Sequence, residues 1–139
     1  GLSPHALAAA AQAGIDLAPA LERVGGLLGT YRRLLDSFVA DLADQPAQLE
    51  ALAAAGDLPA LRRQLHTLKG LAATLGDAGL SARAAHAEAA LASLEPEAAQ
   101  VLAARLARQL REAQVRLQRF AREAWSTADA PLADQPCST

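Results

Sequence analysis

Apolar residues recur at spacings of three and four along most of the chain, the spacing of an amphipathic helix. The clearest stripe consists of Leu58, Leu61, Leu65, Leu68, Ala72 and Leu75. At roughly 100° per residue these side chains share one narrow face of a helix, and His66 points well away from that face. The pattern therefore predicts a helix with a buried apolar face and a histidine exposed to water.

Similar stripes predict three more long helices, over about 27–42, 79–94 and 97–125. Shorter helical segments are expected near the N-terminus, where the stripe is weak and the helix should be peripheral, and over 47–55. Asp57 is well placed as the N-cap of the helix that contains His66. Four long helices with short connections predict an all-α, antiparallel up-down-up-down four-helix bundle, with the short N-terminal helices packed across one end.

The periodicity is lost after Trp125, which we expect to anchor the end of the core. Residues 1–125 are therefore predicted to form a single domain, and residues 126–139 a flexible tail or linker. The chain has no methionine, so it is not an unprocessed complete translation product. We expect a domain of a larger protein.

Composition supports the helical prediction and narrows the function. Hydrophobic residues make up 52% of the chain, mostly Ala and Leu, and aromatic residues only 3%. The net charge of -2 argues against nucleic acid as a partner. No apolar run has the length of a membrane span and no signal peptide is visible, so we expect a cytoplasmic domain without membrane contact. The single Cys137 excludes an internal disulfide.

The sequence lacks a phosphate-binding glycine loop, zinc-ligand spacing, and a Ser or Cys nucleophile paired with a base, so kinase, ATPase or hydrolase activity of its own is not expected. What remains is an exposed imidazole with Arg62, Arg63 and Lys69 on neighbouring turns and no carboxylate cluster around it. A neutral imidazole nitrogen is a nucleophile. Lys69 is placed to offset the charge of a phosphoryl group on that nitrogen. The small residues Gly70 and Ala73 leave room for a partner.

The pattern His66-x-x-Lys69-Gly70, followed by Gly76, resembles the signature of histidine-containing phosphotransfer (HPt) domains of two-component phosphorelays. The resemblance covers roughly residues 15–94 and is closest to the HPt domains of hybrid sensor histidine kinases. It rests also on the segments 21–26, 31–38 and 53–57, which follow the family's usual order.

The resemblance implies that His66 carries a phosphoryl group, that Lys69 supports it, and that Gly70 keeps the approach open. The implied partners are response-regulator receiver domains, including those of the same parent protein together with its kinase domain. The resemblance also implies that Mg²⁺ belongs to the receiver, so that the domain needs no cofactor or metal of its own. Arg62, Arg63, Gly70 and Ala73 are the expected docking residues, on a domain expected to be a monomer.

Three positions depart from the family pattern. Leu27 stands where an Asp often caps the second long helix, Leu71 replaces a small or hydroxyl residue, and Leu65 replaces a commoner Ala. None of these is the acceptor. His86, with Arg83 three residues before it, is the best competitor as acceptor, and no role is assigned to His5.

Two other classes of function stay open. A helical adapter would bind a partner helix through an apolar groove and use no phosphate chemistry. A histidine-based hydrolase has less support, because no nucleophile or orienting carboxylate is visible for His66. The particular receiver, the direction of phosphoryl flow, the stimulus, and the choice between a hybrid-kinase module and a stand-alone or chemotaxis-type protein also stay open.

Overall fold

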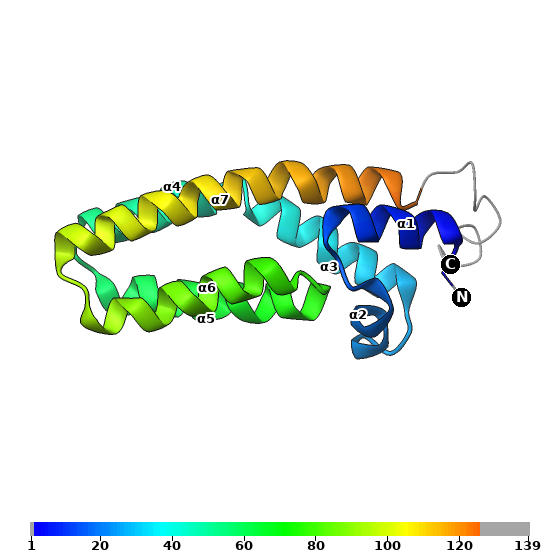
Figure 1. Cartoon of the computed structure of the whole chain (residues 1–139), viewed down its shortest axis with the longest axis horizontal. Coiled ribbons are helices and arrows are strands. Elements are labelled where there is room, and N and C mark those ends of the chain that lie inside the picture. The colour runs from blue at the N-terminus through cyan, green and yellow to red at the C-terminus, as the bar shows by residue number, and fades with distance from the viewer. Residues whose placement is uncertain (1, 126–139) are drawn as a thin grey trace.

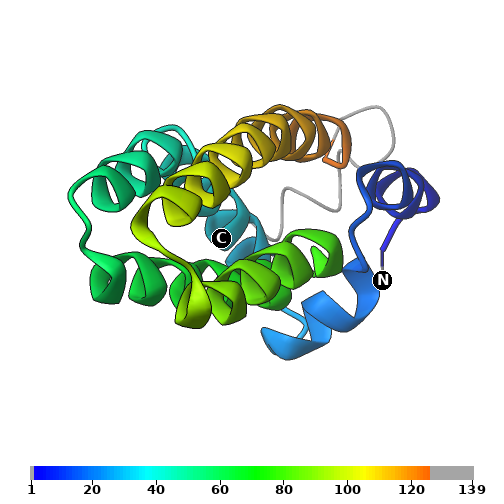
Figure 2. The same cartoon turned by 60° about the vertical axis from the view of Figure 1, so that its left-hand side comes forward.

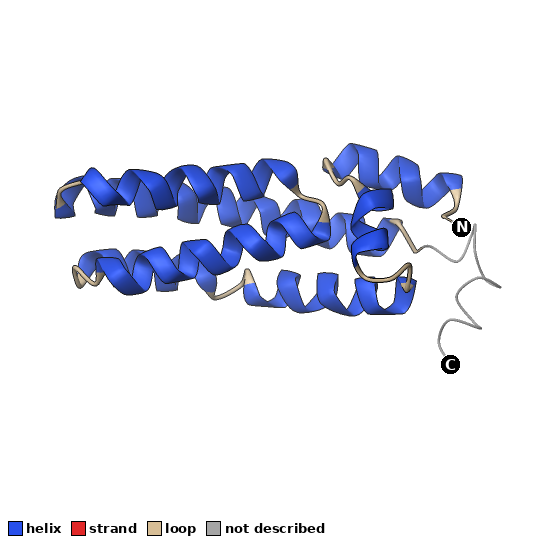
Figure 3. Ribbon diagram, turned by 90° about the horizontal axis from the view of Figure 1, so that it is seen from below, coloured by secondary structure: helices blue, strands red, loops and turns tan. Residues whose placement is uncertain are grey.

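The computed structural model describes residues 2–125, and within them the chain is helical with loops and no strand (Figure 3). The elements are α1 (Pro4–Ala13), α2 (Leu17–Arg23), α3 (Leu28–Asp41), α4 (Gln45–Ala54), α5 (Leu58–Leu75), α6 (Ala78–Ala90), a 3₁₀ turn (Leu91–Ser93) and α7 (Pro96–Glu123). The predicted all-α class is confirmed. The predicted tail, 126–139, lies outside the described residues.

The bundle is built from two pairs of helices. The helices α5 and α6 form one antiparallel pair, and α7 runs back along α4 and then α3 to form the other side (Figures 1 and 2). The short helix α4 continues the direction of α3 along α7, so the two together supply one side of the four-helix arrangement. The predicted bundle is therefore confirmed, with one of its four sides divided between two helices.

The predicted stripes form the core. On α5, Leu61, Leu65, Leu68, Ala72 and Leu75 are all buried, and Leu58 and Leu71 are partly buried against the core. The largest fully buried side chains outside α5 include Tyr31, Leu35, Phe120 and Leu117. Burial of this face fixes the rotation of α5, and the rotation leaves His66 on the outside.

Both ends of α5 are defined by specific residues. The Asp57 side chain accepts a hydrogen bond from the amide of Ala60 (3.2 Å) and begins the helix, as predicted. Gly76 ends it with a φ of 90°, a left-handed conformation that favours glycine. The next helix begins at Ala78, one residue earlier than the sequence suggested, because the Asp77 side chain caps it by accepting from the amide of Leu80 (3.2 Å).

The expectation of a peripheral N-terminal helix is wrong in one respect. Four alanines of α1 are buried, and the helix lies along the C-terminal half of α7 (Figure 1). Alanine contributes little to a hydrophobic stripe, but its small side chain lets two helices approach closely. The Arg116 Nη1 atom of α7 also donates to the carbonyl oxygen of Ala13 at 2.6 Å.

Two expectations about single side chains can be checked at the ends of helices. Leu27 precedes α3 as its N-cap residue, makes no side-chain cap hydrogen bond and is 61% exposed. Trp125 packs against the core, with its ring centroid 6.5 Å from that of Tyr31 and 6.0 Å from that of Phe120. The guanidinium of Arg32 lies 5.2 Å from the indole centroid. The predicted role of Trp125 as an anchor at the end of the core is confirmed.

Candidate functional site

His66 lies on the outward face of α5 with 68% of its side chain exposed. Its Nδ1 atom is 3.2 Å from Oε2 of Glu88, which comes from α6. The other carboxylate oxygen, Oε1, is 3.1 Å from Nζ of Lys69. One carboxylate therefore links the histidine to the lysine one turn further along the same helix.

The charge of Glu88 determines which nitrogen of His66 holds the proton. The hydrogen bond from Lys69 lowers the pKa of the Glu88 carboxyl below its usual range, and the contact with His66 acts in the same direction. An ionised carboxylate only accepts hydrogen bonds, so Nδ1 must be the donor in this contact. In a neutral ring this leaves Nε2 without a proton and available as a nucleophile.

Contacts at the C-terminal end of α5 fix the helix in the bundle. The buried Tyr31 hydroxyl donates to the carbonyl oxygen of Leu75 (2.6 Å), and the Arg23 guanidinium donates to that of Ala73 (2.7 Å). Closer to the site, the Ser81 hydroxyl donates to the backbone oxygen of Lys69 at 3.0 Å. This last bond ties α6 to the turn of α5 that carries the lysine, and so helps to set the register that places Glu88 beside His66.

The predicted docking residues share the exposed surface of α5 around His66. Arg62, Arg63, Gly70 and Ala73 are all exposed, and within residues 2–125 the two arginines form no ion pair. A Cβ added at Gly70 would meet no heavy atom within 4 Å, so among the described residues this glycine is not required for helix packing. The arrangement is an open surface with a nucleophile near its centre.

Glu88 is the residue that sequence reasoning missed. It stands 22 residues after His66 and on another helix, and its position depends on the register between α5 and α6. A weak signal was present, because Glu88 is a charged residue in an alanine-rich helix. That signal becomes specific only when the hairpin of the two helices is assumed and the flank of α6 facing α5 is identified.

The other two histidines lie elsewhere. His86 is exposed on α6 and lines a groove shared with α7, away from Lys69. His5 has its Nε2 atom 2.5 Å from the carbonyl oxygen of Glu123 and so ties α1 to α7. Within residues 2–125 no group of three or more His, Cys, Asp or Glu side chains could hold a metal ion.

A helical bundle that presents an exposed histidine, oriented by a carboxylate and flanked by a lysine, is chemically suited to accept a group on that imidazole. Residues 33–124 match the Hpt domain family, and the chain belongs to that family. Hpt domains are the histidine phosphotransfer domains of two-component systems and interact with receiver domains of response regulators.

No match was found among curated proteins or among solved structures. None of the helices over residues 2–125 has both the length and the hydropathy that a membrane span requires.

Proposed function

We propose that His66 relays a phosphoryl group to and from the aspartates of receiver domains. The observation that supports this most directly is the contact of Nδ1 with Glu88, because it leaves the reactive nitrogen pointing to solvent. No kinase or nucleotide-hydrolysing activity is needed, since the phosphoryl group arrives already activated as an acyl phosphate.

The transfer step follows from this geometry. Nε2 attacks the phosphorus of the receiver's aspartyl phosphate, an N–P bond forms, and the P–O bond to the aspartate breaks with its electron pair left on the carboxylate. The ring keeps its Nδ1 proton and becomes cationic, and the Glu88 carboxylate stabilises that charge. In the reverse direction the same cationic ring is a good leaving group.

Lys69 supports the phosphoryl oxygens in this proposal. Its ammonium group lies against Glu88 in the free domain, one turn from His66 on the same side of the helix. A phosphoryl group on Nε2 would bring further negative charge to the same region. Lys69 can then serve both anions, which lowers the repulsion between the phosphoryl oxygens and the carboxylate.

We expect the divalent cation of the reaction to be held by the receiver, because receiver domains supply the aspartate and the in-line geometry. The small residues Gly70 and Ala73 give the receiver access to the ring, and Arg62 and Arg63 form a charged rim beside it. The particular partner can be identified by measuring the rate of phosphoryl transfer between this domain and each receiver domain of the same organism.

Replacing His66 with Gln should abolish labelling by a phosphorylated receiver, because the nucleophile is lost from an exposed position that the fold does not need. Labelling is measured with radioactive phosphate on a gel after alkaline treatment, which phosphohistidine survives. The matched control is His86→Gln, which removes another exposed histidine and should leave labelling unchanged. Labelling that persists in H66Q, or is lost in H86Q, would contradict the assignment of His66. If no receiver labelled the unaltered protein, a helical adapter would be favoured instead.

Replacing Lys69 with Ala should slow the transfer several-fold without unfolding the bundle, because the phosphoryl oxygens lose their nearby cation. Stopped-time labelling gives the rate, and circular dichroism gives the helical content. Arg63→Ala is the control. It removes an exposed cation that lies on the same helix but forms no ion pair with Glu88, and it should have a smaller effect on the transfer rate. Equal rates for K69A and the unaltered protein would remove the lysine from the mechanism.

A further inference from the structure

A groove lies between α6 and α7, with a volume of about 410 Å³. Arg83 and His86 line it from α6, and Arg105 and Gln109 line it from α7. Its remaining lining is aliphatic, from Ala82, Ala87, Leu102 and Leu106. The groove therefore combines an apolar floor with cationic and hydrogen-bonding groups from two different helices.

The composition of α6 explains why the groove exists. Alanine is the commonest residue of this helix, so the α6 side of the interface lacks the volume to fill the space in front of α7. On α7, Gln109 follows the buried Leu106 by three residues and precedes the buried Ala113 by four, yet it is only half-buried and lines the groove. A polar side chain at this half-buried position beside the aliphatic lining can form a hydrogen bond with a polar occupant of the groove.

The charge of the groove is not compensated by its surroundings. No acidic residue lines it, and within residues 2–125 neither Arg83 nor Arg105 forms an ion pair. An isolated arginine on a surface is usually just solvated. Here two arginines and a histidine from two helices line one groove whose remaining lining is largely aliphatic, which is a more specific arrangement.

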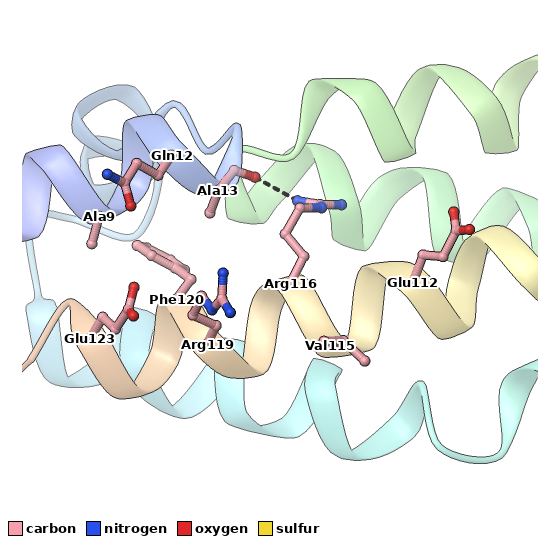
Figure 4. A pocket seen from close by; sticks show the side chains of 9 residues that line it. All are labelled: Ala9, Gln12, Ala13, Glu112, Val115, Arg116, Arg119, Phe120 and Glu123. Atoms are coloured by element: carbon pink, nitrogen blue, oxygen red, sulfur yellow. Dashed lines mark hydrogen bonds between the residues drawn. The ribbon is translucent and has the colours of Figure 1, made fainter.

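A second hollow, between α1 and α7, provides a contrast (Figure 4). It also contains two arginines, Arg116 and Arg119, but two glutamates, Glu112 and Glu123, line it as well. Arg116 there donates to the carbonyl oxygen of Ala13 and to Asp77. Its cations are therefore balanced or engaged, whereas those of the α6–α7 groove are not.

We propose that the α6–α7 groove binds a small phosphate monoester with an apolar body. Guanidinium groups match the oxygens of a phosphate in pairs, so the dianion suits two permanent cations, and the His86 ring offers a further hydrogen-bonding group. The floor of leucine and alanine would hold the apolar body, and Gln109 would orient it. The volume falls within the range of small-molecule sites. The groove is separate from His66. Glu88 contacts His66 from the flank of α6 that faces α5, whereas the groove lies between α6 and α7.

The test is an amide NMR titration of the whole chain with phenyl phosphate and, separately, with inorganic phosphate. Saturable shifts are expected at the groove residues of α6 and α7, with phenyl phosphate binding about tenfold more tightly than inorganic phosphate because its ring covers the apolar floor. The double variant Arg83→Gln with Arg105→Gln should weaken the binding of phenyl phosphate at least about tenfold, the loss of roughly one charge-assisted contact.

The double variant Arg62→Gln with Arg63→Gln is the matched control, since it removes two exposed arginines from another surface and should leave the affinity unchanged. An equal loss in this control would show attraction by net charge and overturn the proposal. Shifts centred on His66 and Lys69, or no saturable shift at millimolar phenyl phosphate, would overturn it as well. Benzoate binding as tightly as phenyl phosphate would overturn the assignment of phosphate as the ligand group. Phosphoryl relay through His66 does not depend on any of these results.

Discussion

At the scale of single residues, the site consists of a part that the sequence predicts and a part that only the fold supplies. His66 and Lys69 share one helix, so helical periodicity and spacing are enough to place them on the outer face together. Glu88 reaches them across a helix pair. Contacts between helices depend on register and rotation, which one-dimensional patterns leave undetermined, and for this reason the carboxylate beside His66 could not be predicted.

Substitutions of Glu88 should change the rate at which His66 accepts a phosphoryl group. Replacing it with Ala should slow phosphoryl acceptance by His66 about three- to tenfold, because the acceptor that fixes the Nδ1 proton is lost. Replacing it with Gln should have a smaller effect, because the amide oxygen can still accept from Nδ1 although the charge is gone. Transfer rates from a phosphorylated receiver test the effect on chemistry, and the ring ¹⁵N shifts of His66 report the tautomer.

Glu112→Ala is the control, since it removes a glutamate that is exposed on another helix, α7. It should leave both the rate and the tautomer unchanged. If E88A showed the unaltered ratio of tautomers, the orienting role of Glu88 would be wrong even if the rate fell.

At the scale of elements, the long helices and their buried faces were predictable because each stripe is strong within one helix. The helix α1 was underestimated because its buried face is made of alanine. The division of one side of the bundle into α3 and α4 was visible in the sequence as the break at Asp44, Gln45 and Pro46, but the alignment of both pieces along α7 was not. That alignment is set by packing between distant segments.

Gly70 within α5 and Gly76 at its C-terminal cap should respond to alanine in opposite ways. Gly70→Ala should stabilise the fold by about 0.5–1 kcal/mol, because the position is helical and open. Gly76→Ala should destabilise it by about 2–4 kcal/mol, because φ is +90° and the new Cβ would lie 2.6 Å from the carbonyl oxygen of Asp16. Urea unfolding followed by circular dichroism measures both changes.

The Gly70→Ala variant also distinguishes an effect on the stability of the fold from an effect on receiver docking. If Gly70 keeps the surface open for a receiver, G70A should transfer more slowly although it is more stable. Transfer by G70A at the unaltered rate would show that the receiver does not need this clearance, while leaving the role of His66 intact.

At the scale of the whole molecule, segments outside the family match are part of the same folded unit. The match covers residues 33–124, yet Ile15, Leu17 and several alanines from residues 4–23 are buried in the hydrophobic core. The amide of Asp16 donates to the carbonyl oxygen of Gly76 at 2.9 Å, which connects the N-terminal helices to the end of α5. Such connections between distant segments leave no periodic signal in the sequence.

Asp77 shows how these segments are coupled. Its carboxylate caps α6 and also accepts from Arg116 Nη2 at 2.8 Å, while the same guanidinium donates to Ala13 of α1. The Asp77 side chain is only 4% exposed and that of Arg116 is 31% exposed. The Arg116 guanidinium thus joins the start of α6 and the end of α1 to the C-terminal half of α7.

Asp57 offers a comparison that isolates this coupling, because both aspartates cap a helix through a 3.2 Å bond to the amide three residues on. Asp57→Ala should cost about 1 kcal/mol of unfolding free energy, the ordinary value of an N-cap. Asp77→Ala should cost about 2–4 kcal/mol, because it also leaves Arg116 without its partner; water at the partly exposed guanidinium keeps the cost below that of a fully buried pair. Equal losses for the two variants in urea unfolding would mean that Asp77 acts only as a cap and that the ion pair contributes nothing to joining the N-terminal helices to the bundle.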